Sequence, residues 1–286
     1  MGVLSVVLLV ATILGLIAVS GRGGAWRVPV LAALAGLATG TIRSEDVSSA
    51  TDRLGGPLLF LLLAVPLAVE LDRSGFFASV AALAARASRR RLRAFLWWFA
   101  AAVVVVFNLD AAVVLLTPLY LRIARERDEP IITICLAPAL LASLASSALP
   151  VSNLTNLIVD ERFALGPGPF VRHLLLPTIA ATTVGWFRYR RLLPEPSTQV
   201  APGGTIVRRD GLRIGMATTV WLLVGFVGGG ALGVSAWAIV VPPLLVLCVV
   251  HRRIPWRDVP LDAALIALGL GAVTAAAAPH LGLVAL

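Results

Sequence analysis

The sequence predicts an all-α membrane protein, a polytopic helical bundle, from composition, run length and the placement of charge. Of the 286 residues, 59% are hydrophobic and 14% are charged, whereas an ordinary soluble domain carries about 25% charged residues. Several apolar runs approach the ~20 residues that a helix needs to cross a bilayer. The runs are continuous blocks, unlike the short alternating strands of an outer-membrane barrel. The charged residues collect between them.

The apolar runs give the expected elements in chain order. The first 20 residues lack a basic start, so they predict a retained span and not a cleaved signal. A short run at 74–86, followed by arginines, predicts an interfacial helix. The expected crossing segments are 3–19, 28–42, 54–71, a broken helix starting at 131, then 171–187, 214–232, 235–250 and 261–278.

Residues 94–107 and 111–124 predict a re-entrant helical hairpin. Each run has 14 residues, which rise only about 21 Å as a helix, less than the ~30 Å hydrocarbon core. Arginine clusters precede the first run and follow the second, so both flanks belong on one side. The expected turn is 108–110. The alternative is one tilted or kinked helix of about 30 residues, with its basic clusters on opposite faces.

The distribution of arginine sets the predicted orientation. All 24 basic residues are arginine, and 20 of them fall in loops that the hairpin topology places in the cytoplasm. This asymmetry agrees with the positive-inside rule and puts the amino terminus outside. A single crossing by 94–124 would invert every later loop and abolish the bias. The predicted cytoplasmic loops are 21–27, 72–93, 122–130, 188–213 and 251–258.

Two polar interruptions inside apolar runs predict a solute path, because polar groups at bilayer depth are costly and usually line a cavity. One is at the hairpin turn, and the other follows Pro150, which breaks the helix that starts at 131. Their amides and hydroxyls suit an oxyanion, a metalloid hydroxide or a cation held by carbonyls. The candidate binding residues are Asn108, Asp110, Thr117, Ser152, Asn153, Thr155 and Asn156.

Two of these candidates have a second interpretation. Asp110 is the only carboxylate in the two interruptions. It either couples transport to a proton or cation, or it caps the second hairpin helix. The Thr117 hydroxyl either contacts solute or bonds back to a carbonyl of its own helix.

Other function classes are not indicated. Cys135 and Cys248 lie far apart inside apolar runs, so no metal site and no cofactor are expected. An intramembrane enzyme would need paired carboxylates or a serine with a base, and Asp110 has no such partner in sequence. The arginines in loops set orientation and do not indicate nucleic acid. Glu70 lies at the membrane edge, where it is expected to snorkel or to pair with Arg73, and not to act in transport.

Three stretches together resemble the arsenite permease family: residues 70–77, 107–118 and 149–156. That family belongs to the ion transporter superfamily, with citrate and dicarboxylate carriers and some sodium/proton antiporters. The resemblance implies two inverted halves, each with a re-entrant hairpin and a broken helix, and solute bound between their tips. It places Asn108 and Asp110 at the first tip. It places Ser152, Asn153, Thr155 and Asn156 at the break.

The resemblance also implies an activity. The expected function is secondary transport, in the inner membrane, of a small inorganic anion, metalloid hydroxide or organic acid. Among these, efflux of arsenite is the activity that the resemblance favours most. The expected partners are the lipid bilayer, the solute and a coupling proton or sodium ion, and some family members work with a cytoplasmic ATPase.

The sequence differs from the arsenite permeases in two respects. Leu109 separates Asn108 from Asp110, where the family has an adjacent Asn-Asp pair, and no second hairpin turn appears before Leu286. The expected organisation is a first half at 1–190, a cytoplasmic linker at 191–213 and a partial second half at 214–286. The alternative function is therefore a truncated non-transporting remnant, or a half-transporter subunit that needs a second chain or a homodimer.

Overall fold

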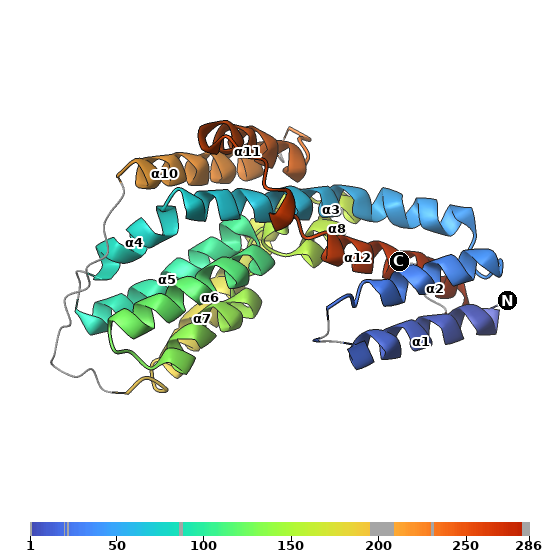
Figure 1. The fold of residues 1–286 in the computed structure, drawn as a ribbon, viewed down its shortest axis with the longest axis horizontal. Coiled ribbons are helices and arrows are strands. Elements are labelled where there is room, and N and C mark those ends of the chain that lie inside the picture. The colour runs from blue at the N-terminus through green and yellow to red at the C-terminus, as the bar shows by residue number, and fades with distance from the viewer. Residues whose placement is uncertain are drawn as a thin grey trace. The chain divides into compact units, whose positions relative to one another are not determined.

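The computed structural model of this chain describes residues 2–19, 21, 23–85, 88–194, 209–229 and 232–281 (Figure 1). These residues form twelve α-helices joined by turns and short 3-10 or π segments, with no strand among them. The all-α prediction is confirmed. In the described part of the chain, three helices are long and apolar enough to cross a membrane: Gly2–Val19, Ser44–Arg73 and Leu261–Leu281.

The chain divides into two compact units, which are described separately. The first comprises residues 1–62 and 260–286, and the second comprises residues 63–259. The predicted halves at 1–190 and 214–286 concern repeat symmetry and stay a prediction. Most of the expected linker at 191–213 lies outside the described residues, which resume at Arg209.

The first unit contains α1 (Gly2–Val19), α2 (Arg27–Ala38), the amino-terminal part of α3 (Ser44–Arg73) and α12 (Leu261–Ala277). Small residues allow its helices to approach closely, as in other membrane bundles. A Cβ added at Gly269 of α12 would lie 2.8 Å from the Pro29 carbonyl oxygen of α2. On α1, the buried Ser5 and Thr12 hydroxyls donate to carbonyls of their own helix. The outward residues of α1 are largely apolar and exposed, as expected of a lipid-facing helix.

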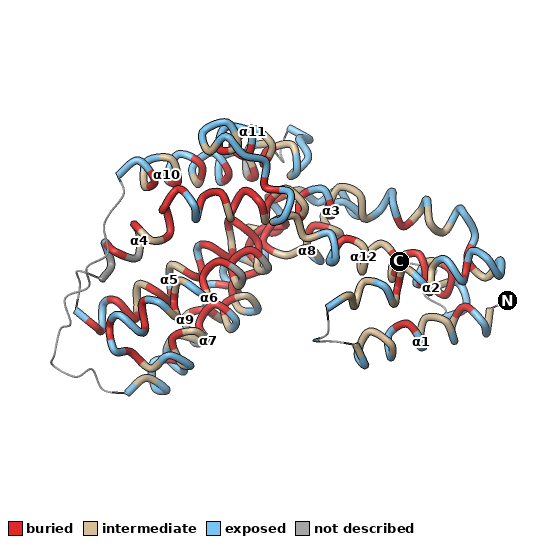
Figure 2. Tube along the Cα trace, in the orientation of Figure 1, coloured by how far each residue is buried: buried red, intermediate tan, exposed pale blue. Residues whose placement is uncertain are grey.

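The second unit holds the hairpin and the broken helix. Its most buried helices are α5 and α6, and Figure 2 shows the burial concentrated there and along the end of α3. Trp97 and Tyr120, both fully buried, are its largest core side chains. Besides the end of α3 and two 3-10 turns (Pro150–Ser152 and Trp256–Asp258), the unit contains α4 (Phe76–Ala85), α5 (Arg89–Phe107), α6 (Leu109–Glu126), α7 (Ile131–Leu144), α8 (Leu154–Phe163), α9 (Pro167–Tyr189), α10 (Arg209–Val224), a π segment (Gly225–Gly229) and α11 (Ala236–His251).

The helical hairpin is present, and its two arms run antiparallel. The Tyr120 hydroxyl on α6 donates to the Leu96 carbonyl on α5 at 2.5 Å. Near the base, Arg93 of α5 bonds to Glu129, which follows α6. Figure 1 shows the two arms side by side. A single continuous helix over 94–124 is therefore excluded.

The hairpin differs from the prediction in its turn and in the length of its arms. The turn is Asn108 alone, since α6 already begins at Leu109. The arms have 19 and 18 residues because the flanking arginines continue the helices. An arm of 19 residues rises about 28 Å, but the first turns of α5 carry Arg89, Arg90, Arg91 and Arg93. The apolar part of this arm is therefore still shorter than the hydrocarbon core of the bilayer.

Polar contacts join loops that the arginine count places on the cytoplasmic side. Arg93, from the loop at 72–93, bonds to Glu129 at 122–130 and to the Pro194 carbonyl at 188–213. Arg73 and Arg253 both pair with Asp258, which joins the loops at 72–93 and 251–258. Loops in direct contact belong to the same face, so these contacts agree with the predicted grouping of these four loops, and their cytoplasmic placement stays a prediction.

Other predicted boundaries shift for local reasons. The run at 28–42 gives only α2, which is followed by Gly40 with φ of 69°. The run at 54–71 lies inside the longer α3, whose first turn contains Glu45 and Asp46, because acidic side chains stabilise a helix amino terminus. The predicted interfacial helix at 74–86 is the ten-residue α4. The structure contains no bilayer, so its interfacial position stays a prediction.

Candidate functional site

The break after α7 follows from Pro150. Proline has no N–H to donate to the carbonyl four residues earlier, and its ring clashes with that carbonyl. The carbonyl concerned is that of Ser146, and α7 ends just before it, at Leu144. Leu149, the residue before the proline, is extended with φ −129° and ψ 152°, as this position prefers. Pro150 was predicted to break the helix, and the helix in fact ends six residues before it.

Polar side chains of the break satisfy the backbone groups that the proline frees. The Asn156 amide donates to the Ser146 carbonyl at 2.8 Å, and the fully buried Ser152 hydroxyl lies 2.8 Å from the same oxygen. Asn153 caps α8, because its side-chain oxygen accepts from the Thr155 N–H at 3.0 Å. These contacts hold residues 150–153 as a short 3-10 turn and an extended residue instead of a continuous helix.

Asn108 forms the tip of the hairpin. Its φ of 82° and ψ of 152° lie in a region that residues with a Cβ rarely adopt. The side chain is fully buried, and its amide donates to the Val151 carbonyl at 3.3 Å. The tip therefore packs directly against the 3-10 turn of the break. The two polar interruptions, 43 residues apart in sequence, meet in space.

Two helices begin where the tip meets the break. α6 starts at Leu109 and α8 at Leu154. The first turns of a helix carry free N–H groups and a partial positive charge. The side chains around them, those of Asn108, Ser152, Asn153 and Asn156, are neutral donors and acceptors. This arrangement can replace the hydration of a neutral polar solute or of a small anion without burying a formal charge.

The remaining predicted residues, Asp110, Thr155 and Thr117, differ in their distance from the hairpin tip and in their exposure. Asp110 is in the first turn of α6, and its side chain is outside the described part of the structure. Thr155 is exposed, in the first turn of α8. Thr117 lies eight residues after Leu109, about 12 Å along the helix. It is half-buried, and its carbonyl faces Cys135 of α7, so α6 carries it away from the tip. The binding roles of all seven residues stay a proposal.

Sequence reasoning missed most of a buried ionic cluster around Glu70. Glu70, at the end of α3, is fully buried. The predicted pair with Arg73 is present at 3.6 Å. The carboxylate also meets His251 Nδ1 at 2.5 Å and Arg253 Nε at 3.8 Å. His251 and Arg253 lie 181 and 183 residues further along the chain, so no local pattern could reveal the cluster. It ties the end of α3 to the end of α11.

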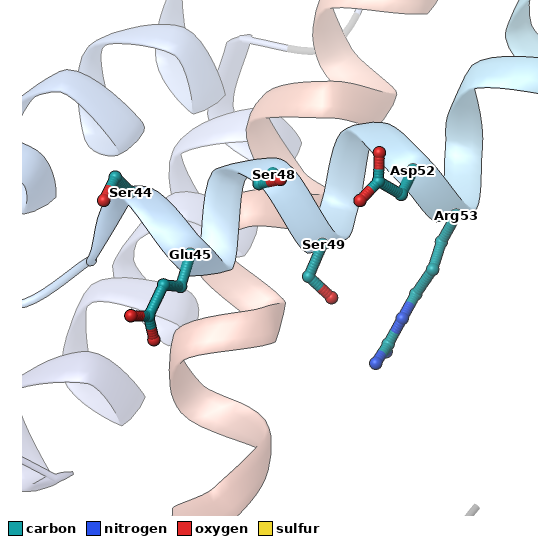
Figure 3. A pocket seen from close by; sticks show the side chains of 6 residues that line it. All are labelled: Ser44, Glu45, Ser48, Ser49, Asp52 and Arg53. Carbon is teal, nitrogen blue, oxygen red and sulfur yellow. The ribbon is translucent and has the colours of Figure 1, made fainter.

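A separate surface cavity of about 570 Å³ lies along the start of α3 (Figure 3). All its lining residues come from successive turns of that one helix, and none is a predicted site residue. They are Ser44, Glu45, Ser48, Ser49, Asp52 and Arg53.

Comparison with known proteins finds membrane transporters, the class of protein in which a hairpin tip and a broken helix form a solute site. The family model described as citrate transporter matches residues 3–278. The arsenical pump membrane protein of Yersinia enterocolitica is 28% identical over 241 residues, which cover 80% of this chain and 56% of that protein. The proteins of the same name from Escherichia coli K12 and Shigella flexneri are each 26% identical over 246 residues, which cover 82% of this chain and 57% of theirs. The chain thus spans just over half the length of these relatives.

Proposed function

This chain belongs to the citrate transporter family, and we propose that it moves a small polar solute across the inner membrane as a secondary transporter. Its relatives named as arsenical pump membrane proteins support the predicted resemblance to arsenite permeases. The family is one of transporters, which agrees with the expectation that the chain is not an enzyme. Family membership and the apolar helices make it a multi-pass protein of that membrane.

The observation that carries the proposal is the hydrogen bond from Asn108 to the Val151 carbonyl. It joins a hairpin tip to a helix break, and such discontinuities form solute sites in secondary transporters. A solute bound beside them would meet the starts of α6 and α8, neutral amides and freed carbonyls.

Arsenite export is the best-supported activity. Arsenous acid is a small neutral hydroxide at neutral pH, and it needs donors and acceptors but no counter-charge. The described side chains at the tip and break carry no formal charge. A citrate trianion would bury charge without a cationic side chain among them, which is costly. This contrast favours a metalloid hydroxide over a tricarboxylate.

For coupling, we propose that Asp110 takes up a proton or sodium ion. The first turn of α6 is the position where a carboxylate either caps the helix or meets an ion near the solute. Replacement by asparagine separates the two roles, because asparagine keeps a side-chain oxygen that can accept from a free N–H of the first turn but cannot titrate. Loss of ion-dependent export with unchanged thermal stability would assign coupling. Unchanged export would leave Asp110 as a cap.

The second candidate is a half-transporter that works only with a second polypeptide or a second copy of itself. The share of the curated relatives that the chain covers, 56–57%, is the reason to test it. Export that appears only when the remaining part of such a relative is co-expressed would favour this candidate over export by the chain alone. A cytoplasmic ATPase is a further proposed partner, and its co-expression forms a separate arm.

The test is arsenite resistance in a host that lacks its own arsenite efflux. Cells carrying the wild-type chain, Asn108→Ala, Asn153→Ala or the empty vector are grown over a range of arsenite concentrations. Thr51→Ala serves as the control, because Thr51 is exposed on α3 and its hydroxyl donates to the Val47 carbonyl of the same helix at 2.9 Å. The proposal predicts resistance with the wild type and control, and sensitivity with both site variants at equal protein levels. Equal sensitivity of wild type and empty vector would rule out arsenite export by this chain alone.

A further inference from the structure

An arginine-lined cavity of about 580 Å³ opens at the base of the hairpin. It lies between the start of α5 and the end of α9, within the second unit. The charged lining is Arg90 and Arg93 from α5 with Arg190 and Arg191, the two residues that follow α9. Trp186 and Leu193 form part of its apolar wall.

Arg93 is a fixed, charge-compensated part of this cavity. It is only 6% exposed, and its guanidinium bonds to Glu129 at 2.6 and 2.8 Å. A third bond, at 2.6 Å, goes to the Pro194 carbonyl. The bond to Pro194 joins the α5 side of the cavity to the side that follows α9. The Glu129 carboxylate balances the charge of Arg93.

The other three arginines have no carboxylate partner among the described residues. Arg90, Arg190 and Arg191 are exposed, and in the described part of the chain none of them pairs with a carboxylate. The Arg190 guanidinium lies over the Phe187 ring at 4.5 Å, which holds it beside the cavity. Among the residues that the structure describes, three positive charges thus line one concave surface without a carboxylate partner.

We propose that this cavity binds the phosphodiester head group of an anionic phospholipid of the cytoplasmic leaflet. The arginine distribution puts this end of the hairpin in the cytoplasm. Basic pockets between membrane helices on that side attract anionic lipid, and planar guanidinium groups bind phosphate oxygens in pairs. Free phosphate has the same charge chemistry. The lipid is preferred because Trp186 and Leu193 give its glycerol and upper acyl carbons an apolar wall.

The proposal goes beyond solute transport and is tested without it. The full chain, purified in a neutral detergent, is titrated with dioleoylphosphatidylglycerol, dioleoylphosphatidylcholine or inorganic phosphate. Native mass spectrometry counts bound lipid, and thermal unfolding reports stabilisation. The expected result for the wild type is at least ~tenfold tighter binding of phosphatidylglycerol than of phosphatidylcholine. Both lipids offer a phosphodiester to the arginines, but the choline cation of phosphatidylcholine cancels its net charge and is repelled by these three guanidinium groups.

The matched variants are Arg190→Gln/Arg191→Gln in the cavity and Arg252→Gln/Arg257→Gln, which removes two exposed arginines of another cytoplasmic loop. The cavity variant is expected to lose about tenfold or more in phosphatidylglycerol affinity, and the control less than about twofold. Arg190→Lys/Arg191→Lys should fall between them, because lysine keeps the charge and loses the paired geometry. If the cavity variant fails to fold, Arg90→Gln, which alters the opposite wall, replaces it with the same direction of effect.

Three results would overturn the proposal. One is equal binding of the two lipids by the wild type. Another is an equal loss in the cavity and control variants. The third is stabilisation by inorganic phosphate with none by phosphatidylglycerol, which would make the cavity a site for free phosphate.

Discussion

Asn108 gives the sharpest test of how the hairpin tip is built. In the structure its backbone has φ 82° and ψ 152°, and its buried amide donates to the Val151 carbonyl at 3.3 Å. The Asn108→Ala change keeps the Cβ in that backbone region and leaves the buried carbonyl without this donor. An unsatisfied buried acceptor costs about 1–3 kcal/mol. The Asn108→Gly change loses the same hydrogen bond, but glycine adopts the backbone conformation freely.

The two variants therefore separate two physical terms. Residues with a Cβ pay about 1–3 kcal/mol in this backbone region, so the glycine variant regains roughly what it loses with the hydrogen bond. We expect wild type and Asn108→Gly within about 2 kcal/mol of each other. Asn108→Ala should be less stable than the wild type by about 1–3 kcal/mol.

The assay is unfolding of the purified chain in mixed micelles of dodecylmaltoside and increasing dodecylsulfate, followed by tryptophan fluorescence. The alanine variant should be the least stable of the three, and the wild type and the glycine variant should lie close together. An alanine variant as stable as the glycine variant would show that the tip is not held in the left-handed region. An alanine variant as stable as the wild type would also show that the hydrogen bond to the Val151 carbonyl does not contribute to stability.

Three further predictions concern the parts that support the tip. Single cysteines at positions 90 and 125, in a cysteine-free background, should react with an impermeant maleimide from the same side of the membrane; labelling from opposite sides would reject the hairpin topology. Gly211→Ala should lower stability by about 1–3 kcal/mol, because its Cβ would collide with the Ser74 carbonyl. Gly228→Ala, where a Cβ meets open space, is its control, and equal effects would refute the close packing of α10. Arg93→Gln should cost about 3–5 kcal/mol by stranding buried Glu129, and Arg93→Met/Glu129→Leu should recover much of it; a double variant less stable than the single would contradict this reasoning.

The hairpin and the break were predictable because each is caused locally. Two basic flanks around a polar turn can share one membrane face only if the chain doubles back, and Pro150 must end a helix. The position of the break also had a local cause that the prediction missed. Proline excludes the helix from the carbonyl of Ser146 onward, and not merely from its own position.

The lengths of the hairpin arms were not predictable from hydropathy. Arginines at 89–93 are polar, so an apolar window ends before them, yet arginine is a good helix former and α5 continues through them. The side-chain contacts reach across 43 positions at the tip, up to 183 positions in the Glu70 cluster, and 101 positions from Arg93 to Pro194 at the arginine cavity. Only the packed fold brings such residues together.

The contact between tip and break carries the transport proposal, and a cysteine pair measures it directly. Asn108→Cys and Val151→Cys are introduced together in a chain without native cysteines, and isolated native membranes are treated with a mild oxidant or a short bifunctional thiol reagent. The structure predicts an intramolecular cross-link that neither single variant forms, detected by mass spectrometry of the linked peptides. Free thiols at both positions, in membranes where both are shown to react with maleimide, would mean that the tip and the break do not meet.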